Sequence, residues 1–394
     1  MGMKIVNIET ARLGGATGCV RVDTDEDISG YGEATPEQTP EAVFKYIERF
    51  ADEYLIGSDP TAIEKHRRTL QDAVWYYKGV VPSSAITAIE HALWDIKGKK
   101  LSVPVYELLG GPVREKVRVY KWIGAETRDN LPEQAEARVD EGLTGMKFCP
   151  TPNNPSAYPQ VVDEVRKTVR EVREAVGPDI DLMLDPAQRF KLSEAKHILS
   201  ELEAFNPLFA EDFISPYQTS TIEKLADSTH IPYALGDRLL YVQDFEEIIN
   251  RDAAAVLQPD IAHVGGLGQI KAIAAAAEYH GMRVAPHNAV GPIATAAAVH
   301  IDLAIPNFLI QEIAGLDYFG GWQLDDYLDI DVLDTEDGYI PAPEEPGLGV
   351  SVSDEVFEDD FEINLEDPPL FVDPTDFHVP QRFMCWEHYD DQVF

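Results

Sequence analysis

Hydrophobic residues are spaced in two different ways along the chain, and the change falls near residue 116. Beyond that point, short apolar runs alternate with segments whose apolar residues recur every three or four positions. The runs are residues 117–123, 145–149, 180–184, 208–211, 233–236, 254–258, 283–286 and 308–311. Short apolar runs separated by amphipathic helices are typical of parallel strands joined by helical crossovers. We therefore predict an α/β domain over residues 116–350.

The segments between the runs have the spacing of helices that bury one face. Valines recur every three or four residues over 162–176, and Gly177 follows as a stop signal. The same spacing occurs in residues 195–202 and 270–277. Eight such units favour a TIM-type barrel, with an open doubly wound sheet as the alternative. No GxGxxG motif opens a first helix, and the glycines of residues 265–268 come too late to favour a nucleotide site.

The two ends of the chain follow other patterns. Residues 3–12 and 19–24 predict two strands joined by a turn, and residues 37–56 and 59–78 predict helices. We therefore predict an α+β domain over residues 1–115. The segment 351–394 is acidic and rich in proline, yet it holds Phe371, Phe383, Trp386 and Tyr389. Aromatic residues usually pack on something, so we expect this tail to dock on the N-terminal domain or on a neighbouring subunit.

The charge balance limits what the protein can bind. The 394 residues include 70 Asp and Glu against 32 Lys and Arg, a formal net charge of −38. Such a field repels nucleic acid and anionic membranes, so neither is expected as a partner. The acidic side chains repel one another at low ionic strength, which points to a halophilic protein. A disordered acidic chain is the alternative, and a hydrophobic content of 44% argues against it.

Targeting and redox signals are weak. The three cysteines, Cys19, Cys149 and Cys385, are widely spaced and suggest neither a disulfide framework nor a metal site. The first ten residues hold one lysine and no long apolar run, so we expect no signal peptide. No stretch of 18 apolar residues occurs, which predicts no membrane span. A cytoplasmic location is the expectation.

Three consecutive predicted strands end in carboxylates. Asp185 follows the run 180–184, Glu211 ends the run 208–211, and Asp237 follows the run 233–236. Chemistry in TIM barrels is located where the strands end, and neighbouring strands lie about 4.8 Å apart. Hard oxygen ligands suit Mg²⁺. Acidic residues are common in this chain, but a chance match at three strand ends is improbable, so we predict a magnesium site.

Other strand ends carry further polar residues. Asp260 follows the sixth run and His287 the seventh, so the two can meet at adjacent strand ends. A carboxylate on one imidazole nitrogen raises the basicity of the other, although a lone strand-end histidine is often structural. Lys147 lies within the second run, and Glu312 follows the eighth. A lysine inside an apolar strand must point toward something polar.

The sequence resembles the mandelate racemase branch of the enolase superfamily in the order of its candidate residues, which is Lys147, Asp185, Glu211, Asp237, Asp260, His287 and Glu312. Spacings of 26, 26, 23, 27 and 25 residues from Asp185 to Glu312 are similar to those of the galactonate dehydratase group. Residues 89–98, 258–266 and 285–292 also match, and the resemblance covers about residues 3–350. It implies a modified TIM barrel, (β/α)7β, with an N-terminal α+β capping domain, and a homo-oligomer.

The resemblance also implies a function, the Mg²⁺-dependent dehydration of a sugar acid to a 2-keto-3-deoxy acid through an enediolate. The handling of the α-proton by a Lys or His base beside Mg²⁺ is a known pattern of this superfamily. By resemblance, Asp185, Glu211 and Asp237 are the metal ligands. His287 with Asp260 is the base, or the base and later the acid. Lys147 lies on the opposite face, and Glu312 hydrogen-bonds a substrate oxygen.

Three departures from the family pattern change the expected substrate. The third ligand is Asp237 where the group usually has Glu, and Ala187 replaces the histidine that acts as general acid in galactonate dehydratases. Lys147-Phe148-Cys149 lacks the second lysine of racemases. We therefore expect a gluconate- or xylonate-type acid. A racemase or epimerase of a 2-hydroxy acid and a non-catalytic sugar-acid-binding relative are the alternatives.

Overall fold

The computed structural model describes residues 2–14, 17–35, 40–124, 130–151, 158–313 and 327–358. The four aromatic residues of the predicted docking tail lie outside these ranges. The start of that segment lies on the N-terminal sheet, where Arg21 pairs with Asp354 at 2.7 Å and its guanidinium lies 4.2 Å from the centre of the Phe357 ring. Docking of the rest of the tail stays a prediction.

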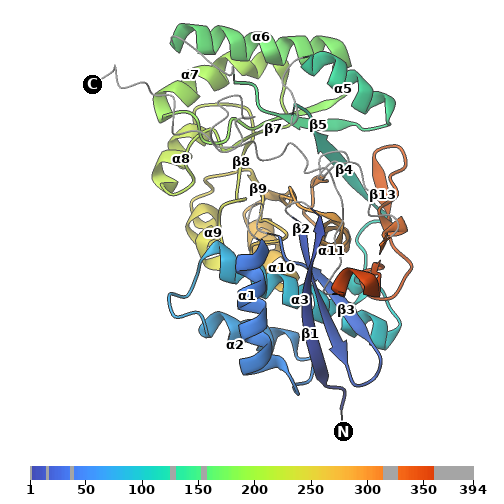
Figure 1. Cartoon of the computed structure of the whole chain (residues 1–394). Helices are drawn as coiled ribbons and strands as arrows, with labels where there is room; N and C mark the ends of the chain where they lie inside the picture. Colours follow the sequence, from blue (N-terminus) through green and yellow to red (C-terminus); the bar gives the residue numbers. More distant parts are fainter. Residues whose placement is uncertain are drawn as a thin grey trace.

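Within the described residues, eight parallel strands form a curled sheet (Figure 1). They are β4 (Lys116–Trp122), β5 (Gly145–Phe148), β6 (Asp181–Leu184), β7 (Phe209–Glu211), β8 (Tyr233–Leu235), β9 (Val256–Leu257), β10 (Arg283–Val284) and β11 (Gln311–Glu312). Each strand from β4 to β9 pairs with the next, and β11 returns to pair with β4. A single parallel bridge between Val284 and Phe308 links the two ends of the sheet. The predicted barrel is therefore confirmed.

One helix follows each strand from β4 to β10, which gives the (β/α)7β order. These helices are α5 (Leu131–Asp140), α6 (Tyr158–Val176), α7 (Leu192–Leu202), α8 (Thr219–Ala226), α9 (Tyr241–Asn250), α10 (Leu267–Tyr279) and α11 (Pro292–Ala304). The valines of α6 at 162, 165, 169 and 172 are buried, as their spacing predicts. The eighth strand begins later than its apolar run suggests, because residues 308–310 contribute only the bridge to β10.

A layer of side chains from the strands fills part of the barrel interior. It consists of Tyr120, Met183, Phe209, Ala234, Val256, Ala285 and Ile310, all nearly or fully buried. Side chains along a strand alternate between its two faces, so a residue two positions later points the same way. The interior layer therefore fixes which residues at the strand ends face the site.

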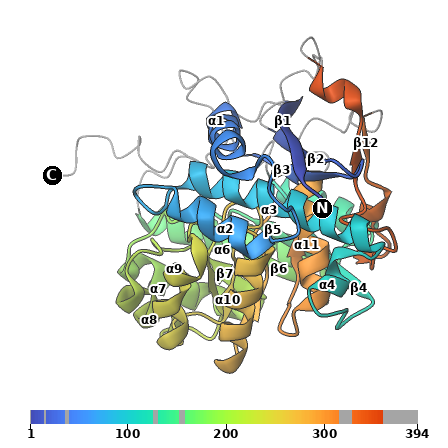
Figure 2. The same cartoon turned by 90° about the horizontal axis from the view of Figure 1, so that it is seen from below.

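The N-terminal domain combines a three-stranded antiparallel sheet with helices (Figure 2). Its strands are β1 (Ile5–Gly14), β2 (Thr17–Thr24) and β3 (Ser29–Glu33), and its helices are α1 (Pro40–Phe50), α2 (Ile63–Asp72) and α3 (Val80–Leu101), with a π-helical turn at Ala51–Leu55. Strand β3 was not predicted, because Gly30 and Gly32 resemble turn signals. Both are needed here, since a Cβ on Gly32 would lie 1.9 Å from the carbonyl oxygen of Ala88 in α3.

The remaining elements are short. Helix α4 (Val105–Leu108) links the two domains, β13 (Tyr339–Pro341) pairs with β4, and β12 (Leu328–Asp329) pairs with β14 (Ser351–Val352). The domain limits at residues 115 and 350 stay predictions. Among the described helices, none combines the length and the apolar character that a membrane crossing requires.

Most acidic side chains of the described residues lie at the surface. The buried carboxylates among these residues are Glu33, Glu90, Asp95, Glu211, Asp212, Asp260, Asp302 and Glu312. The exposed carboxylates repel one another across water, where salt screens them over about 10 Å at 0.1 M and about 3 Å at 1 M. The surface therefore supports the proposal that the protein is adapted to salt.

We expect KCl to stabilise the fold. Raising KCl from 0.05 to 1 M should raise the thermal midpoint by roughly 5 °C or more, because several kcal/mol of self-repulsion are screened. Scanning calorimetry over a KCl series measures this change. A midpoint that falls or stays constant over this range would contradict the proposed adaptation to salt.

Candidate active site

The alternation along the strands brings most of the candidate residues to one end of the barrel. Five candidates lie two positions after a residue on the same face of their strand. They are Lys147, Asp185, Glu211, His287 and Glu312. The preceding residues are Gly145, Met183, Phe209, Ala285 and Ile310, of which the last four belong to the interior layer. Parallel strands point the same way, so these side chains all lie at the carboxyl ends of the strands.

Asp237 reaches the site by a different route. The alternation of β8 would place Gly236, two residues after Ala234, on the interior face. Gly236 has φ +143°, and a Cβ there would lie 2.8 Å from the backbone nitrogen of Gln258. The glycine therefore lets the chain turn out of the strand, and Asp237 leaves the alternation of the other ligand candidates.

Lys147 is fully buried and pairs with two carboxylates. Its Nζ donates to both carboxylate oxygens of Glu211, at 3.1 and 2.9 Å, and to Oε2 of Glu312 at 2.9 Å. Burial alone would lower the pKa of Lys147, but Glu211 and Glu312 raise it well above its usual value. Gln258 adds a hydrogen bond from Nε2 to Glu211 at 2.8 Å. The lysine of the second strand is therefore a cation between carboxylates of the fourth and eighth strands of the barrel.

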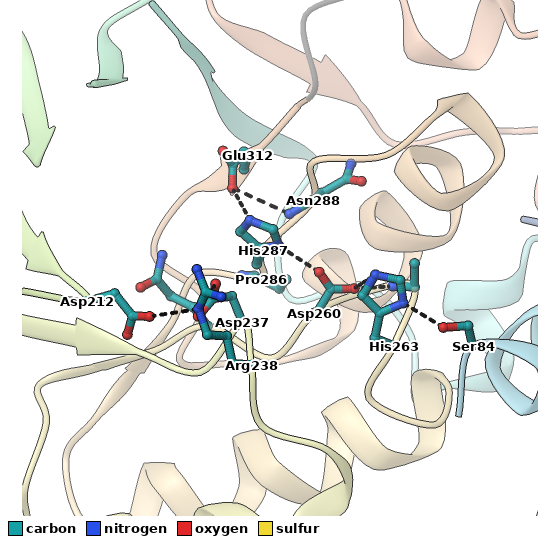
Figure 3. Close-up of polar contacts among 12 residues, drawn as sticks. Ser84, Asp212, Asp237, Arg238, Asp260, His263, Pro286, His287, Asn288 and Glu312 are labelled. Atoms are coloured by element: carbon teal, nitrogen blue, oxygen red, sulfur yellow. Dashed lines mark hydrogen bonds and ion pairs between the residues drawn. The ribbon is translucent and has the colours of Figure 1, made fainter. Parts of the chain in front are cut away.

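His287 and Asp260 meet as their adjacent strand ends predict. Asp260 pairs with His287 in a parallel bridge just beyond β9 and β10, and Nδ1 of the ring lies 2.6 Å from Oδ2 of Asp260. On the other side of the ring, Nε2 lies 3.7 Å from Oε2 of Glu312 (Figure 3). Burial lowers the pKa of His287, but Glu312 and Asp260 outweigh it and raise the pKa to about 10. The imidazolium form is thus stabilised by carboxylates on both sides.

The three metal-ligand candidates lie near one another but do not form a preorganised metal-binding group. Among the described residues, no group of three or more His, Cys, Asp or Glu side chains is placed to hold a metal ion. Asp185 accepts a hydrogen bond from the backbone nitrogen of Ala187 at 2.7 Å, while the carboxylate of Glu211 faces Lys147. Oδ1 of Asp237 is buried and has no hydrogen-bond partner within the described residues.

These donors nevertheless fit a hard divalent cation. All three candidates are carboxylates, the donor type that Mg²⁺ prefers. A buried carboxylate oxygen without a partner, as on Asp237, is costly unless a cation or a donor completes it. Burial, opposed by Lys147 and reinforced by Asp185, raises the pKa of Glu211 to about 7. The cluster thus carries more negative charge than its lysine balances.

Sequence reasoning missed a second group beside the ligand candidates. Asp212 is 1% exposed, and its Oδ2 accepts a hydrogen bond from Nε2 of Gln188 at 2.8 Å. The Nε atom of Arg238 lies 3.4 Å from Oδ2 of Asp212 and 3.6 Å from Oδ2 of Asp237 (Figure 3). An arginine between two carboxylates restrains both, so Arg238 positions the third ligand candidate.

The position of Asp212 could not be read from strand alternation. It directly follows Glu211 and should point to the opposite face of the strand. Its φ of +46° turns the backbone out of the strand and keeps the side chain beside the site. The one available signal was that Arg238 and Asp212 each directly follow a ligand candidate.

Two family profiles cover most of the chain. The profile described as the mandelate racemase/muconate lactonizing enzyme N-terminal domain matches residues 8–110. The profile described as enolase C-terminal domain-like matches residues 130–356, which span the barrel strands from β5 to β11. The two matches follow one another in the same order as the two structural domains.

Two relatives that match over most of their length carry the same name. The chain is 37% identical to a D-galactonate dehydratase of Ralstonia pickettii over 99% of each chain. It is also 37% identical to a D-galactonate dehydratase of Pectobacterium atrosepticum, over 90% of this chain and 93% of the relative. A solved structure of an enolase from Agrobacterium radiobacter, with bound Na and L-malate, has a TM-score of 0.82 at 29% identity, covering 90% of this chain and 94% of that one.

Proposed function

Because this chain belongs to the mandelate racemase/muconate lactonizing enzyme family of the enolase superfamily, we propose that it dehydrates a gluconate- or xylonate-type aldonic acid with Mg²⁺. The broader activity, acid-sugar dehydration by a hydro-lyase, follows from relatives of that function that match over nearly the full length. The observation that carries the proposal is the His287–Asp260 pair, which lies beside Glu312 at the same barrel end as the carboxylate cluster.

His287 acts as the base through Nε2. Its Nδ1 is committed to Asp260 at 2.6 Å, which fixes the tautomer and leaves Nε2 to accept the proton from C2 of the acid. Asp260 and Glu312 stabilise the imidazolium that forms. Lys147 offsets one of the negative charges of Glu211 and Glu312, and Mg²⁺, when bound, would offset more of the negative charge that an anionic substrate meets.

Asp185, Glu211 and Asp237 would hold Mg²⁺. When bound, the metal supplies Lewis-acid stabilisation to the charge that develops on the substrate carboxylate, without which the α-proton is too weak an acid. Arg238, which also contacts Asp212, restrains Asp237, whose side chain is one methylene shorter than the usual Glu. The shorter ligand is therefore held by neighbours.

The proton for the departing 3-hydroxyl comes from His287. Ala187 stands where galactonate dehydratases carry a histidine, and its methyl group has no proton to give. His287 holds the proton taken from C2 and can return it to the hydroxyl as the bond from C3 to oxygen breaks, which releases water. The enol product then takes a proton at C3 and becomes the 2-keto-3-deoxy acid. His287 thus accounts for the proton taken from C2 and the proton given to the 3-hydroxyl, while solvent supplies the proton at C3 and takes the proton of the enol hydroxyl.

A panel of aldonic acids tests the proposal. Gluconate, xylonate, arabinonate and galactonate are incubated with the enzyme in molar KCl and millimolar Mg²⁺, and 2-keto-3-deoxy products are measured. We expect gluconate or xylonate to give the highest kcat/KM and galactonate to be poorer, because Ala187 removes the galactonate-specific acid. Galactonate as the best substrate would overturn the substrate assignment, and exchange at C2 without keto product would indicate a racemase.

A further inference from the structure

One face of α3 in the N-terminal domain holds the loop that carries Asp260. The side chains on this face are Ser83, Ser84, Thr87 and Glu90, which follow helical spacing and are all buried. Thr87 Oγ1 accepts from the backbone nitrogen of Gly265 at 3.0 Å, and Glu90 accepts from Leu267 and Gly268 at 2.9 and 3.0 Å. Ser83 donates to the carbonyl oxygen of His263. The loop after β9 is therefore built against the N-terminal domain.

His263 stands between that helix and the base. Its ring is 5% exposed, with Nδ1 2.8 Å from Ser84 Oγ and Nε2 3.9 Å from Oδ1 of Asp260 (Figure 3). The other oxygen of Asp260, Oδ2, lies 2.6 Å from Nδ1 of His287. The order of contacts is therefore Ser84, His263, Asp260 and His287, from the N-terminal domain to the candidate base.

The hydroxyl of Ser84 fixes which nitrogen of His263 carries a proton. Ser84 donates its only proton to the carbonyl oxygen of Val80 at 2.7 Å, the usual bond of a serine to the preceding turn. Its oxygen can then only accept from Nδ1 of His263, so that nitrogen is an N–H donor. The second ring nitrogen, Nε2, has no hydrogen-bond partner among the described residues and faces Asp260.

The charged groups around this chain of contacts are all carboxylates, apart from Lys147 and the rings themselves. Asp260, Glu312 and Lys147 face His287, and Asp260 and Glu33 of β3 act on His263. Burial raises the pKa of Asp260, but His263 and His287 outweigh it and lower the pKa. His263 and His287 thus face different oxygens of the same carboxylate.

We propose that His263 is a positioning residue for the base: Ser84 of α3 orients its ring, the ring fixes Asp260, and Asp260 holds His287. The proposal rests on the proposed function, in which His287 takes the α-proton. It gives the N-terminal domain a part in the chemistry, because the orientation of the base depends on a helix of that domain.

Two substitutions of His263 separate its two contacts. Asn places an amide at the position of Nδ1, so His263→Asn keeps the contact with Ser84 and loses the group that faces Asp260. Gln places its amide at the position of Nε2, so His263→Gln keeps a polar group beside Asp260 and loses the contact with Ser84. In His263→Asn no ring restrains Asp260, which weakens its contact with His287.

The test is a pH titration of ¹⁵N-histidine-labelled, Mg²⁺-loaded protein by NMR, with His287 assigned by its loss in His287→Asn. We expect His263→Asn to lower the pKa of His287 by roughly one unit, because a less firmly held Asp260 weakens the charge-assisted hydrogen bond that stabilises the imidazolium. His263→Gln should shift it by less than half as much. The acidic limb of the pH profile of kcat/KM should move to lower pH by the same amount in His263→Asn.

The readouts distinguish the possible failures. A pKa of His287 that is the same in wild type and in His263→Asn overturns the positioning role, whatever the substrate proves to be. An absence of turnover in wild type overturns the proposed function and leaves the titration valid. Should His263→Asn fail to fold, Ser84→Ala replaces it. That variant should lose the fixed Nδ1–H signal of His263, and an unchanged signal would refute the role of Ser84.

Discussion

Replacing His287 with Asn should lower kcat by about 10³-fold, within the range that a positioned acid–base group contributes. The Asn amide occupies the position of Nδ1, so the contact with Asp260 at 2.6 Å is kept while Nε2 is lost. Exchange of the α-proton with solvent should fall with turnover, because both require the same base. Steady-state kinetics and proton NMR in D₂O measure the two losses.

Thermal unfolding and Mg²⁺ affinity are the controls for this variant. Both should stay near the wild-type values, because His287 contacts none of the three ligand candidates. Loss of turnover with retained exchange would assign the base elsewhere, with Lys147 as the first candidate. In wild type, kcat/KM should rise with pH, since a base acts when deprotonated and the pKa of His287 is raised.

Replacing Asp185 with Asn should abolish turnover at micromolar Mg²⁺ and weaken Mg²⁺ binding about 100-fold or more, a loss of roughly 3 kcal/mol or more. The Asn oxygen can still accept from the backbone nitrogen of Ala187, so the local turn is preserved. Titration calorimetry measures the affinity, and chelation of wild type should give the same loss of turnover.

Asp181 provides a matched control on the same strand. It lies at the start of β6, pairs with Arg118 at 2.7 Å, and is remote from the carboxyl end of the strand. Asp181→Asn should therefore leave Mg²⁺ affinity and turnover unchanged. Equal losses in Asp181→Asn and Asp185→Asn would mean that the effect arises from instability of β6, and would remove Asp185 from the metal site.

The residues at the strand ends were predictable because successive side chains of a strand point to opposite faces of the sheet. Met183 and Asp185, or Ile310 and Glu312, are separated by two positions, so burial of the first dictates where the second points. The same rule failed at Asp212, because a φ of +46° turns a side chain that regular alternation would send to the other face. Single backbone angles of this kind leave no periodic signal.

Contacts between the domains were equally hidden. Ser84 and His263 are 179 residues apart, and neither residue type is unusual in its segment. Strand β3 was missed because glycines such as Gly30 and Gly32 are typical of turns, whereas here the close approach of α3 requires them. Pairing of Lys147 with Glu211 and Glu312 needed the closed ring of strands, since sequence spacing places them 64 and 165 residues apart.

The position of deuterium in the product tests the proposed chemistry most directly. The acid that is turned over is converted in D₂O, and the 2-keto-3-deoxy product is examined by ¹H and ¹³C NMR. The proposed reaction removes the C2 proton, expels the 3-hydroxyl and lets solvent protonate the enol. It therefore predicts one deuterium at C3. A product with only hydrogen at C3, or recovered acid carrying deuterium at C2 without any keto product, would contradict the dehydration through an enediolate.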